Sequence, residues 1–456
     1  MQDERALGAV RDLLMRRCPP RDAARTAVLS PRWRHVWTSS LTTSDINGGE
    51  DRISRLPDKL LSNIVTRLPL KDAARTSTLS PRWRRVWAST PLVLCDADLF
   101  PVLSYGSFVS HTITDTISCI LAVHQGPVRS ICLTYSFHCV VAHDVTLSCK
   151  WLRVLADKGV ESLEFFNHPS SIFGSTSTSL PSEVLLVTSL VRLSLRHWDF
   201  PSTDCLRRAA YVFPRLCELY LCDIHIGATD IDRLLQYSPE LEIFALIDSK
   251  CMPPNVRIRN CNLQCAIFWM SVANMFEVLA APSLERLILW CRKPDGQSIH
   301  DCPIRLSIGH TPNLKVLGYL DPGIHVLKVG STVIKSGGGD EPIGEPNSKF
   351  WLEASPIKCL KSTLRKVVVK NFRGYGSELS FLRFIWERAK VLQELVVDLA
   401  SGDDPALIEE IITKLKSEVC VKRVEGRKSM FMLRSGGSKW CLNIASNLTL
   451  SDPFDF

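Results

Sequence analysis

A short pattern of apolar residues recurs along most of the chain and constrains its fold more than any other feature. The pattern is apolar-x-x-apolar-x-apolar, as in "LVRLSL", and it starts at residues 128, 160, 190, 216, 241, 263, 284, 314, 364 and 392. Successive starts are 32, 30, 26, 25, 22, 21, 30, 50 and 28 residues apart. A unit of this size cannot bury its apolar face alone, so the pattern predicts a solenoid of stacked repeats.

Most of these spacings fall within or near the period of leucine-rich repeats, which is about 20–29 residues. The expected fold is therefore α/β, with one short parallel strand per repeat and a helix or turn returning on the convex side. Residues 229–239 and 403–417 have the cap, the apolar spacing and the proline of such return helices. The widest gap ends in "SGGGDEPIGEPNSK", which indicates a flexible loop, and its first half could be two extra strands or a hairpin.

Residues that alternate with the inward leucines should face the concave surface of the solenoid. In three consecutive repeats these residues form an apolar patch with two tryptophans, which is typical of a binding surface. A register error of one residue, or a covering loop such as 330–349, would instead make the patch part of a core. The candidate binding residues are Ile243, Ile267, Trp269, Ile288 and Trp290.

A second feature is a duplicated segment: residues 21–40 and 71–90 are identical at 14 of 20 positions. Around the second copy, residues 51–90 predict three short helices. The first has an apolar stripe between Pro57 and Pro69, and the second begins at Asp72 as its N-cap. Ser80 and Pro81 open the third, which carries two tryptophans. So small a bundle buries little apolar surface, and we expect it to offer some to a partner.

These residues resemble the F-box, the helical module that docks onto a Skp-type adaptor in SCF ubiquitin ligases. The resemblance rests on "LPDKLLSNIVTRLPLKDAARTSTLSPRWRRVW". It implies that the adaptor is contacted by Leu56, Pro57, Leu60, Ile64, Leu68 and Pro69, and that Leu79, Trp83 and Trp87 support or extend this binding surface. The alternative is that these residues are only the core of a small bundle.

The first copy lacks the Leu-Pro-Asp opening, so we interpret residues 1–41 as a degenerate partial F-box duplicate. A second working docking site there is an open alternative. Residues 360–400 resemble the FBD region of plant F-box proteins, which suggests a plant F-box/LRR/FBD protein. The expected organisation is a polar linker at 42–51, an F-box at 52–92, leucine-rich repeats at 93–360, an FBD region with the final repeats at 361–417, and C-terminal strands or tail at 418–456.

The sequence gives little sign of chemistry of its own. No phosphate-binding loop, dinucleotide fingerprint, metalloprotease motif or nucleophile elbow is present. Cys261 and Cys265 have a zinc-like spacing, but His300 and Cys302 form a poor second pair, so we expect no metal and no cofactor. The net charge of +8 is spread along the chain and does not indicate a nucleic-acid partner.

The chain also lacks a signal peptide and an apolar run long enough to span a membrane, and its 17 cysteines are scattered. We therefore expect a cytoplasmic or nuclear protein without a membrane partner. By resemblance, the chain is a non-catalytic substrate-recognition subunit of an SCF-type ubiquitin ligase. It would bind a Skp-type adaptor, and through it cullin, together with an unknown target protein. The alternative is a repeat scaffold outside a ligase, with a vestigial F-box.

Overall fold

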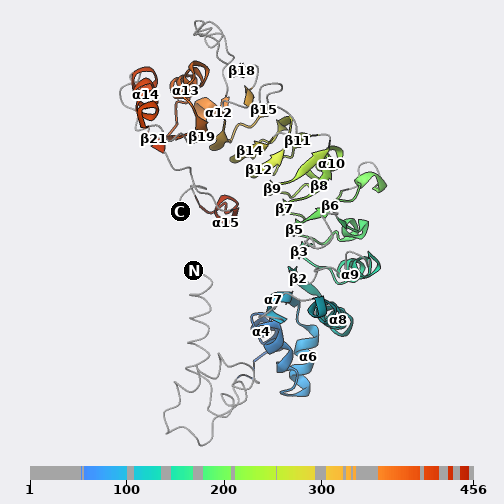
Figure 1. Ribbon diagram of the computed structural model, residues 1–456. Coiled ribbons are helices and arrows are strands. Elements are labelled where there is room, and N and C mark those ends of the chain that lie inside the picture. The colour runs from blue at the N-terminus through green and yellow to red at the C-terminus, as the bar shows by residue number, and fades with distance from the viewer. Residues whose placement is uncertain are drawn as a thin grey trace, which may run out of the picture. The chain divides into compact units, whose positions relative to one another are not determined.

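The chain forms two compact units, Met1–His168 and Pro169–Phe456, seen in the computed structural model of Figure 1. The expected partial duplicate at 1–41, the linker at 42–51 and the loop at 336–349 lie outside the described residues. The structure describes residues 53, 56–99, 107–134, 145–167, 178–206, 211–252, 254–292, 304–321, 325–329, 332–334, 358–400, 405–420, 430–434 and 442–450.

Among its described residues, the first unit has the three expected helices, α4 (Asp58–Val65), α5 (Leu70–Thr76) and α6 (Pro81–Ser89). The hydroxyl of Ser80 accepts a hydrogen bond from the backbone N–H of Trp83 at 3.3 Å, so the predicted N-cap of the third helix is confirmed. The predicted N-cap Asp72 is wrong. Proline at the N-terminal boundary already fixes a helical φ, and α5 begins directly after Pro69, which leaves Asp72 inside the first turn.

The described residues that follow α6 in the first unit form three parallel strands and three helices. Strand β1 pairs in parallel with β2, and β2 pairs in parallel with β3. The elements are β1 (Leu92–Cys95), α7 (Asp96–Leu99), α8 (Ser107–Val123), β2 (Val128–Leu133), α9 (Val145–Asp157) and β3 (Ser162–Phe166).

The second unit is built on one long parallel sheet, called here the main sheet. Its strands pair at the offsets of 26, 25, 22, 21, 30, 50 and 28 residues read from the sequence, so the predicted repeat array is confirmed. The main-sheet strands are β5 (Arg192–Arg196), β7 (Glu218–Cys222), β9 (Ile243–Ile247), β12 (Cys265–Val272), β14 (Arg286–Arg292), β16 (Val316–Leu320), β19 (Lys366–Phe372), β20 (Glu394–Leu399) and β21 (Met430–Arg434).

The middle repeats return through strands as well as through the helices and turns that we expected. These strands form a second sheet, which lies on the same side of the main sheet as α10 (Figure 1). It consists of the parallel strands β11 (Asn255–Arg259), β13 (Met275–Ala280), β15 (Ile304–His310) and β17 (His325–Val329), and of the antiparallel strand β18 (Thr332–Ile334). Phe268 of the main sheet and Phe276 of the second sheet pack with ring centroids 5.1 Å apart and ring planes tilted by 60°, so the two sheets share one core.

Helices return the chain elsewhere. The predicted helix at 229–239 is present as α10 (Ala228–Gln236), and that at 403–417 as α14 (Pro405–Leu415). The remaining elements are the strands β4 (Thr178–Ser179), β6 (Trp198–Asp199), β8 (His225–Gly227) and β10 (Lys250–Met252), the 3-10 helices η1 (Ser182–Leu186) and η2 (Thr203–Cys205), the helices α12 (Lys358–Ser362), α13 (Gly376–Arg388) and α15 (Leu442–Ala445), and the π-helical turn η3 (Lys416–Cys420).

The backbone turns away at the end of several main-sheet strands through a residue with positive φ. His197, Asp223 and Asp248 occupy this place in consecutive repeats, and Met270 occupies it within β12. Histidine and aspartate tolerate this conformation better than methionine does, and β12 has a register shift at the same point, between Trp269 and Ser271. Within the described part of the chain, no helix is long and apolar enough to cross a membrane.

Candidate functional site

The three-helix module, residues 56–89, has a small apolar core. Leu61 and Val65 of α4 lie one helical turn apart and pack against Trp83 and Val86 of α6 and Ala73 of α5. Leu61 and Val65 are completely buried, and Trp83 is 8% exposed. Trp83 therefore belongs to the core, so it can support a partner surface but offers little area of its own to a partner.

A second apolar stripe of α4 faces outward. Leu60, directly before the buried Leu61, is 52% exposed, and Ile64 lies one turn further along the helix and is half-buried. The prolines that precede α4 and α5 are exposed. The other predicted contact residues are half-buried; they are Leu56, Leu68, Leu79 and Trp87. An apolar stripe beside a filled core is surface that a partner can bury.

The start of α4 is fastened to α6 by one arginine. The guanidinium of Arg82 lies 2.7 Å from a carboxylate oxygen of Asp58 and also donates to the carbonyl oxygen of Leu56, with an N–O distance of 2.6 Å. Both partners flank Pro57, so this contact fixes the direction in which the chain enters the module. The charge pair itself is exposed and adds little free energy.

A buried histidine joins the end of α6 to the following α8 helix. Nε2 of His124 lies 3.1 Å from the carbonyl oxygen of Thr90, and its ring lies 5.2 Å from the ring of Trp87. Because the imidazole is buried, its pKa is lowered below the ordinary value of 6.5. The neutral ring therefore acts as a donor to Thr90 and as packing for Trp87.

Two cysteines meet on the adjacent strands β1 and β2. Cys95 and Cys132 are register partners, and a hydrogen bond from Cys132 is the main cause that lowers the pKa of Cys95 to about 7. The same interaction raises the pKa of Cys132. The pair thus contains one acidic thiol within the unit that carries the three helices.

On the concave face of the main sheet, the side chains alternate as the sequence predicts. Cys265 and Ile267 contribute to one apolar cluster with Ile243 and Ile288, whereas Phe268 points to the core between the two sheets. Exposure differs from the expectation. Ile243 is 7% exposed, and Ile267 and Ile288 are completely buried, so these three isoleucines do not form an open patch.

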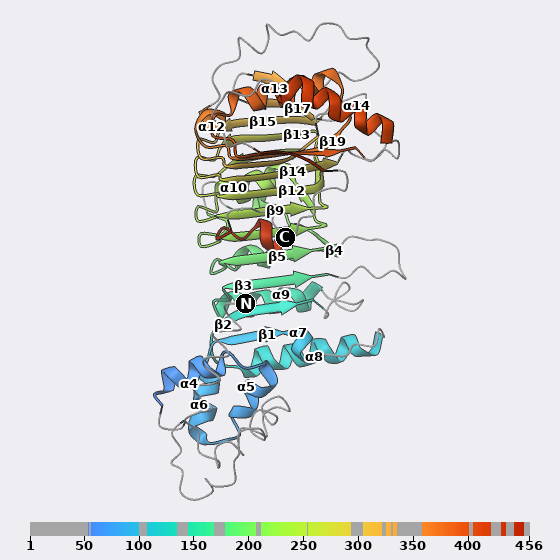
Figure 2. The ribbon, with the colours of Figure 1, turned by 90° about the vertical axis from the view of Figure 1, so that its left-hand side faces the viewer.

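The cause is a segment near the C-terminal end of the described chain, which covers part of this face. Ala445 of α15 is completely buried in the same cluster, and Leu442 and Leu448 pack against it. Figures 1 and 2 show α15 on the face of the main sheet opposite to α10. The loop at 330–349, which we considered as a cover, lies largely outside the described residues. We did not anticipate α15, because a helix of four residues has no periodicity to detect.

The two predicted tryptophans lie at the other end of the same strands and are half-buried. The rings of Trp269 and Trp290 pack with centroids 5.5 Å apart and planes tilted by 36°, and Tyr319 meets Trp269 edge-on at 5.0 Å. Nζ of Lys370 lies over the rings, 4.2 Å from the centroid of Trp290 and 4.7 Å from that of Tyr319. Burial lowers the pKa of Lys370, and the negative charge of Asp398 partly offsets this decrease. This cluster joins aromatic surface to a cation at the edge of the covered face.

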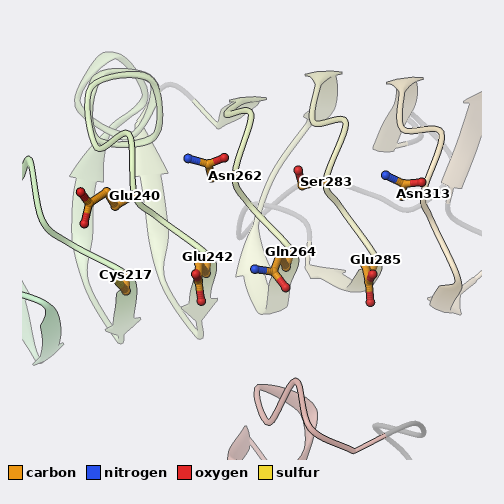
Figure 3. A pocket seen from close by; sticks show the side chains of 8 residues that line it. All are labelled: Cys217, Glu240, Glu242, Asn262, Gln264, Ser283, Glu285 and Asn313. Atoms are coloured by element: carbon orange, nitrogen blue, oxygen red, sulfur yellow. The ribbon is translucent and has the colours of Figure 1, made fainter.

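A polar cleft of about 420 Å³ follows the edge at which the main-sheet strands begin (Figure 3). Glu240, Glu242 and Glu285 line it together with Cys217 and amide side chains. Burial raises the pKa of Cys217, and the nearby carboxylates of Glu242 and Glu240 raise it further. Glu285 forms an ion pair with Lys315 at 2.5 Å. The cleft is acidic, but within the described residues no group of three or more histidine, cysteine or acidic side chains could hold a metal ion.

Three models of protein families match the chain, in this order along it. They are "F-box domain" over residues 53–94, "FBD-associated F-box protein At5g56370, LRR repeats" over residues 149–343, and "FBD" over residues 353–397. A search of curated proteins found no match. The first model falls on the three-helix module, and the other two fall on the repeats. The chain therefore belongs to the F-box proteins that carry leucine-rich repeats and an FBD region.

Proposed function

We propose that this F-box protein is the substrate-recognition subunit of an SCF-type ubiquitin ligase. F-box domains generally bind Skp1-type adaptors, and the outward stripe of α4 at Leu60 and Ile64 offers apolar surface for such contact. The observation that carries the proposal is this stripe: its side chains are not needed to fill the module's own core, which Leu61, Val65 and Trp83 fill.

In this role the adaptor would connect the module to cullin, and the solenoid would hold the target protein. The chain then contributes proximity, because it keeps target lysines close to a ubiquitin-charged enzyme that other subunits supply. No catalytic side chain of this chain takes part in that mechanism. Action in the cytoplasm or nucleus is part of the proposal.

We propose that the target contacts the concave face at Trp269 and Trp290. These two side chains are half-buried, whereas the neighbouring isoleucines are covered. Tryptophan is enriched among the few residues that carry most of the binding energy at protein interfaces. Lys370 adds a cation that can meet a carboxylate of the target.

The adaptor contact is tested by replacing Leu56→Ala together with Pro57→Ala in the full chain. We expect loss of adaptor from pull-downs, while hydrogen exchange of the repeats is unchanged. Retained adaptor binding would refute docking at this surface. Affinity purification with and without proteasome inhibition then separates a ligase subunit from a scaffold. Targets that accumulate only under inhibition support the ligase, and targets that bind but stay stable contradict it.

The target surface is tested by Trp269→Ala with Trp290→Ala. The amount of target protein that co-purifies under proteasome inhibition should fall at least tenfold, while adaptor binding is unchanged. The matched control is Leu279→Ala, because Leu279 is 40% exposed on β13 of the second sheet. Equal losses in the two variants would refute the assignment of the concave face.

A further inference from the structure

The segment that covers the concave face is held by a buried arginine. Arg286 is 4% exposed, and its guanidinium donates to the backbone carbonyl oxygens of Ala445 at 3.1 Å, Asn447 at 2.8 Å and Leu450. Burying a cation is costly unless hydrogen bonds replace its water. Here backbone carbonyl groups replace the water around the guanidinium. The first of them, at Ala445, lies 159 residues after Arg286 in the sequence.

These carbonyls are suited to a cation for a geometric reason. Residues 445 and 447 lie at and just beyond the end of α15, where carbonyl groups have no partner within the helix. The helix end carries partial negative charge, and a guanidinium presents several donors in a fixed plane. Arg286 therefore recognises the end of a helical turn through main-chain atoms, independently of the side chains there.

Selectivity for side chains comes from the apolar cluster. Ala445 is completely buried next to Cys265, and the Cys265 thiol lies 3.6 Å from the Ala445 carbonyl oxygen. Burial raises the pKa of this thiol to about 12, so the thiol is neutral. Leu442 and Leu448 pack on the same cluster. The site accepts a small residue in the centre and a leucine on each side of it.

We propose that residues 442–450 are an intramolecular ligand of the concave face, and that target proteins displace them with an apolar helical turn of the same chemistry. This inference rests on the proposed function, because it describes the peptide that the substrate receptor binds. The turn has a small residue where Ala445 lies, flanking leucine-like residues, and free carbonyls after the helix end.

The segment is suited to displacement because it is small. α15 has four residues, and polar contacts join the segment to Arg286, Cys265 and Tyr220. A tethered ligand benefits from an effective concentration in the millimolar range, so modest contacts suffice to keep it bound. A target that also contacts Trp269 and Trp290 gains binding energy that the segment lacks.

The test uses the full chain and a fluorescent peptide of residues 442–450, LNIASNLTL. In the Ala445→Arg chain, a long cation at a fully buried position beside Arg286 ejects the segment. We expect the peptide to bind this variant at least tenfold more tightly than the unaltered chain. The matched control is Asn443→Arg, which adds the same charge at an exposed position of α15 and should bind the peptide like the unaltered chain.

The same peptide carrying Ala445→Arg should bind none of these proteins. In a chain that combines Ala445→Arg, the ejecting variant, with Arg286→Met, binding of the native peptide should be lost. Leu448→Arg, at a half-buried position, ejects the segment if the Ala445→Arg chain does not fold. Equal peptide binding by the ejecting variants and the control, or no binding by any, overturns the inference. Adaptor pull-down of the same variants separates this result from failure of the proposed function, because the adaptor contact does not involve the concave face.

Discussion

Two neighbouring leucines of α4 allow adaptor binding to be separated from folding. Leu60 is 52% exposed, and Leu61 is completely buried between the three helices, so Leu60→Ala and Leu61→Ala remove the same atoms from opposite environments. We expect Leu60→Ala to weaken adaptor binding with only a small loss of stability. We expect Leu61→Ala to destabilise the module.

The magnitudes follow from burial. Full burial of a leucine side chain contributes about 1.5–3 kcal/mol, and roughly half of that area is still available at Leu60. Its loss should therefore cost about 0.8–1.5 kcal/mol of adaptor binding, which is roughly a four- to twelvefold weaker affinity. The other half of the Leu60 side chain is already buried in the folded module, so the same replacement should lower stability by at most about 0.8–1.5 kcal/mol. Leu61→Ala should cost roughly 2–5 kcal/mol, which is a large share of the stability of so small a bundle.

The assay measures two quantities on the same full-length proteins. Adaptor affinity is measured by titration, and local stability by hydrogen exchange of the amides in α4, α5 and α6. Unchanged affinity in Leu60→Ala would refute the assignment of the outward stripe as the docking surface. Equal loss of protection in both variants would show that Leu60 supports the core, contrary to the burial of the two side chains.

Three further predictions concern two residues with shifted pKa values, His124 and Cys95, and one residue with positive φ, Met270. Burial lowers the pKa of His124, so near and below the ordinary value of 6.5 the unfolded chain binds more protons than the folded chain. The unfolding free energy of the first unit should therefore fall as the pH is lowered from 6.5. Urea titrations at pH 7.5 and 5.5 measure this fall, and it should be smaller in His124→Asn. Iodoacetamide should alkylate Cys95 with a midpoint near pH 7, and Cys132→Ala should move that midpoint toward 9.0; an unmoved midpoint in peptide mapping would contradict the hydrogen bond as the cause. Met270 has a φ of 55°, so Met270→Asn should raise the unfolding free energy by about 0.5–1 kcal/mol, and a lower stability in denaturant titrations would show that its side-chain packing outweighs the strain.

The sequence predicted the repeat array well because stacking imposes a direct constraint on it. Each inward leucine must lie beside its counterpart in the next strand, so the pairing of Arg192 with Glu218, or of Ile243 with Cys265, reproduces the spacing of the pattern. The alternation of strand residues likewise identified the concave side chains. Ser80 acted as the expected cap, whereas Asp72 did not, since Pro69 already defines the start of α5.

Other features depend on contacts between distant parts of the chain and leave little local signal. The sequence identified Ile267 and Ile288 as concave residues, but their burial depends on Ala445, which lies more than 150 residues further along the chain and in a single helical turn. The strands of the second sheet are short, and the alternation in "NVRIR" at 255–259 is the signal that could have indicated them. Their position opposite the main sheet follows from stacking of the repeats.

The second sheet has a consequence for how the concave face responds to a bound protein. In the repeats of β12 and β14, adjacent repeats are joined by two ladders of backbone hydrogen bonds, one in each sheet, with the Phe268–Phe276 contact between them. Repeats that return through helices have a ladder on one side and side-chain packing on the other. The strands that carry Trp269 and Trp290 therefore belong to the stiffest part of the solenoid. A protein that binds there meets a surface that is already ordered, so the entropy lost on binding is chiefly that of the incoming partner.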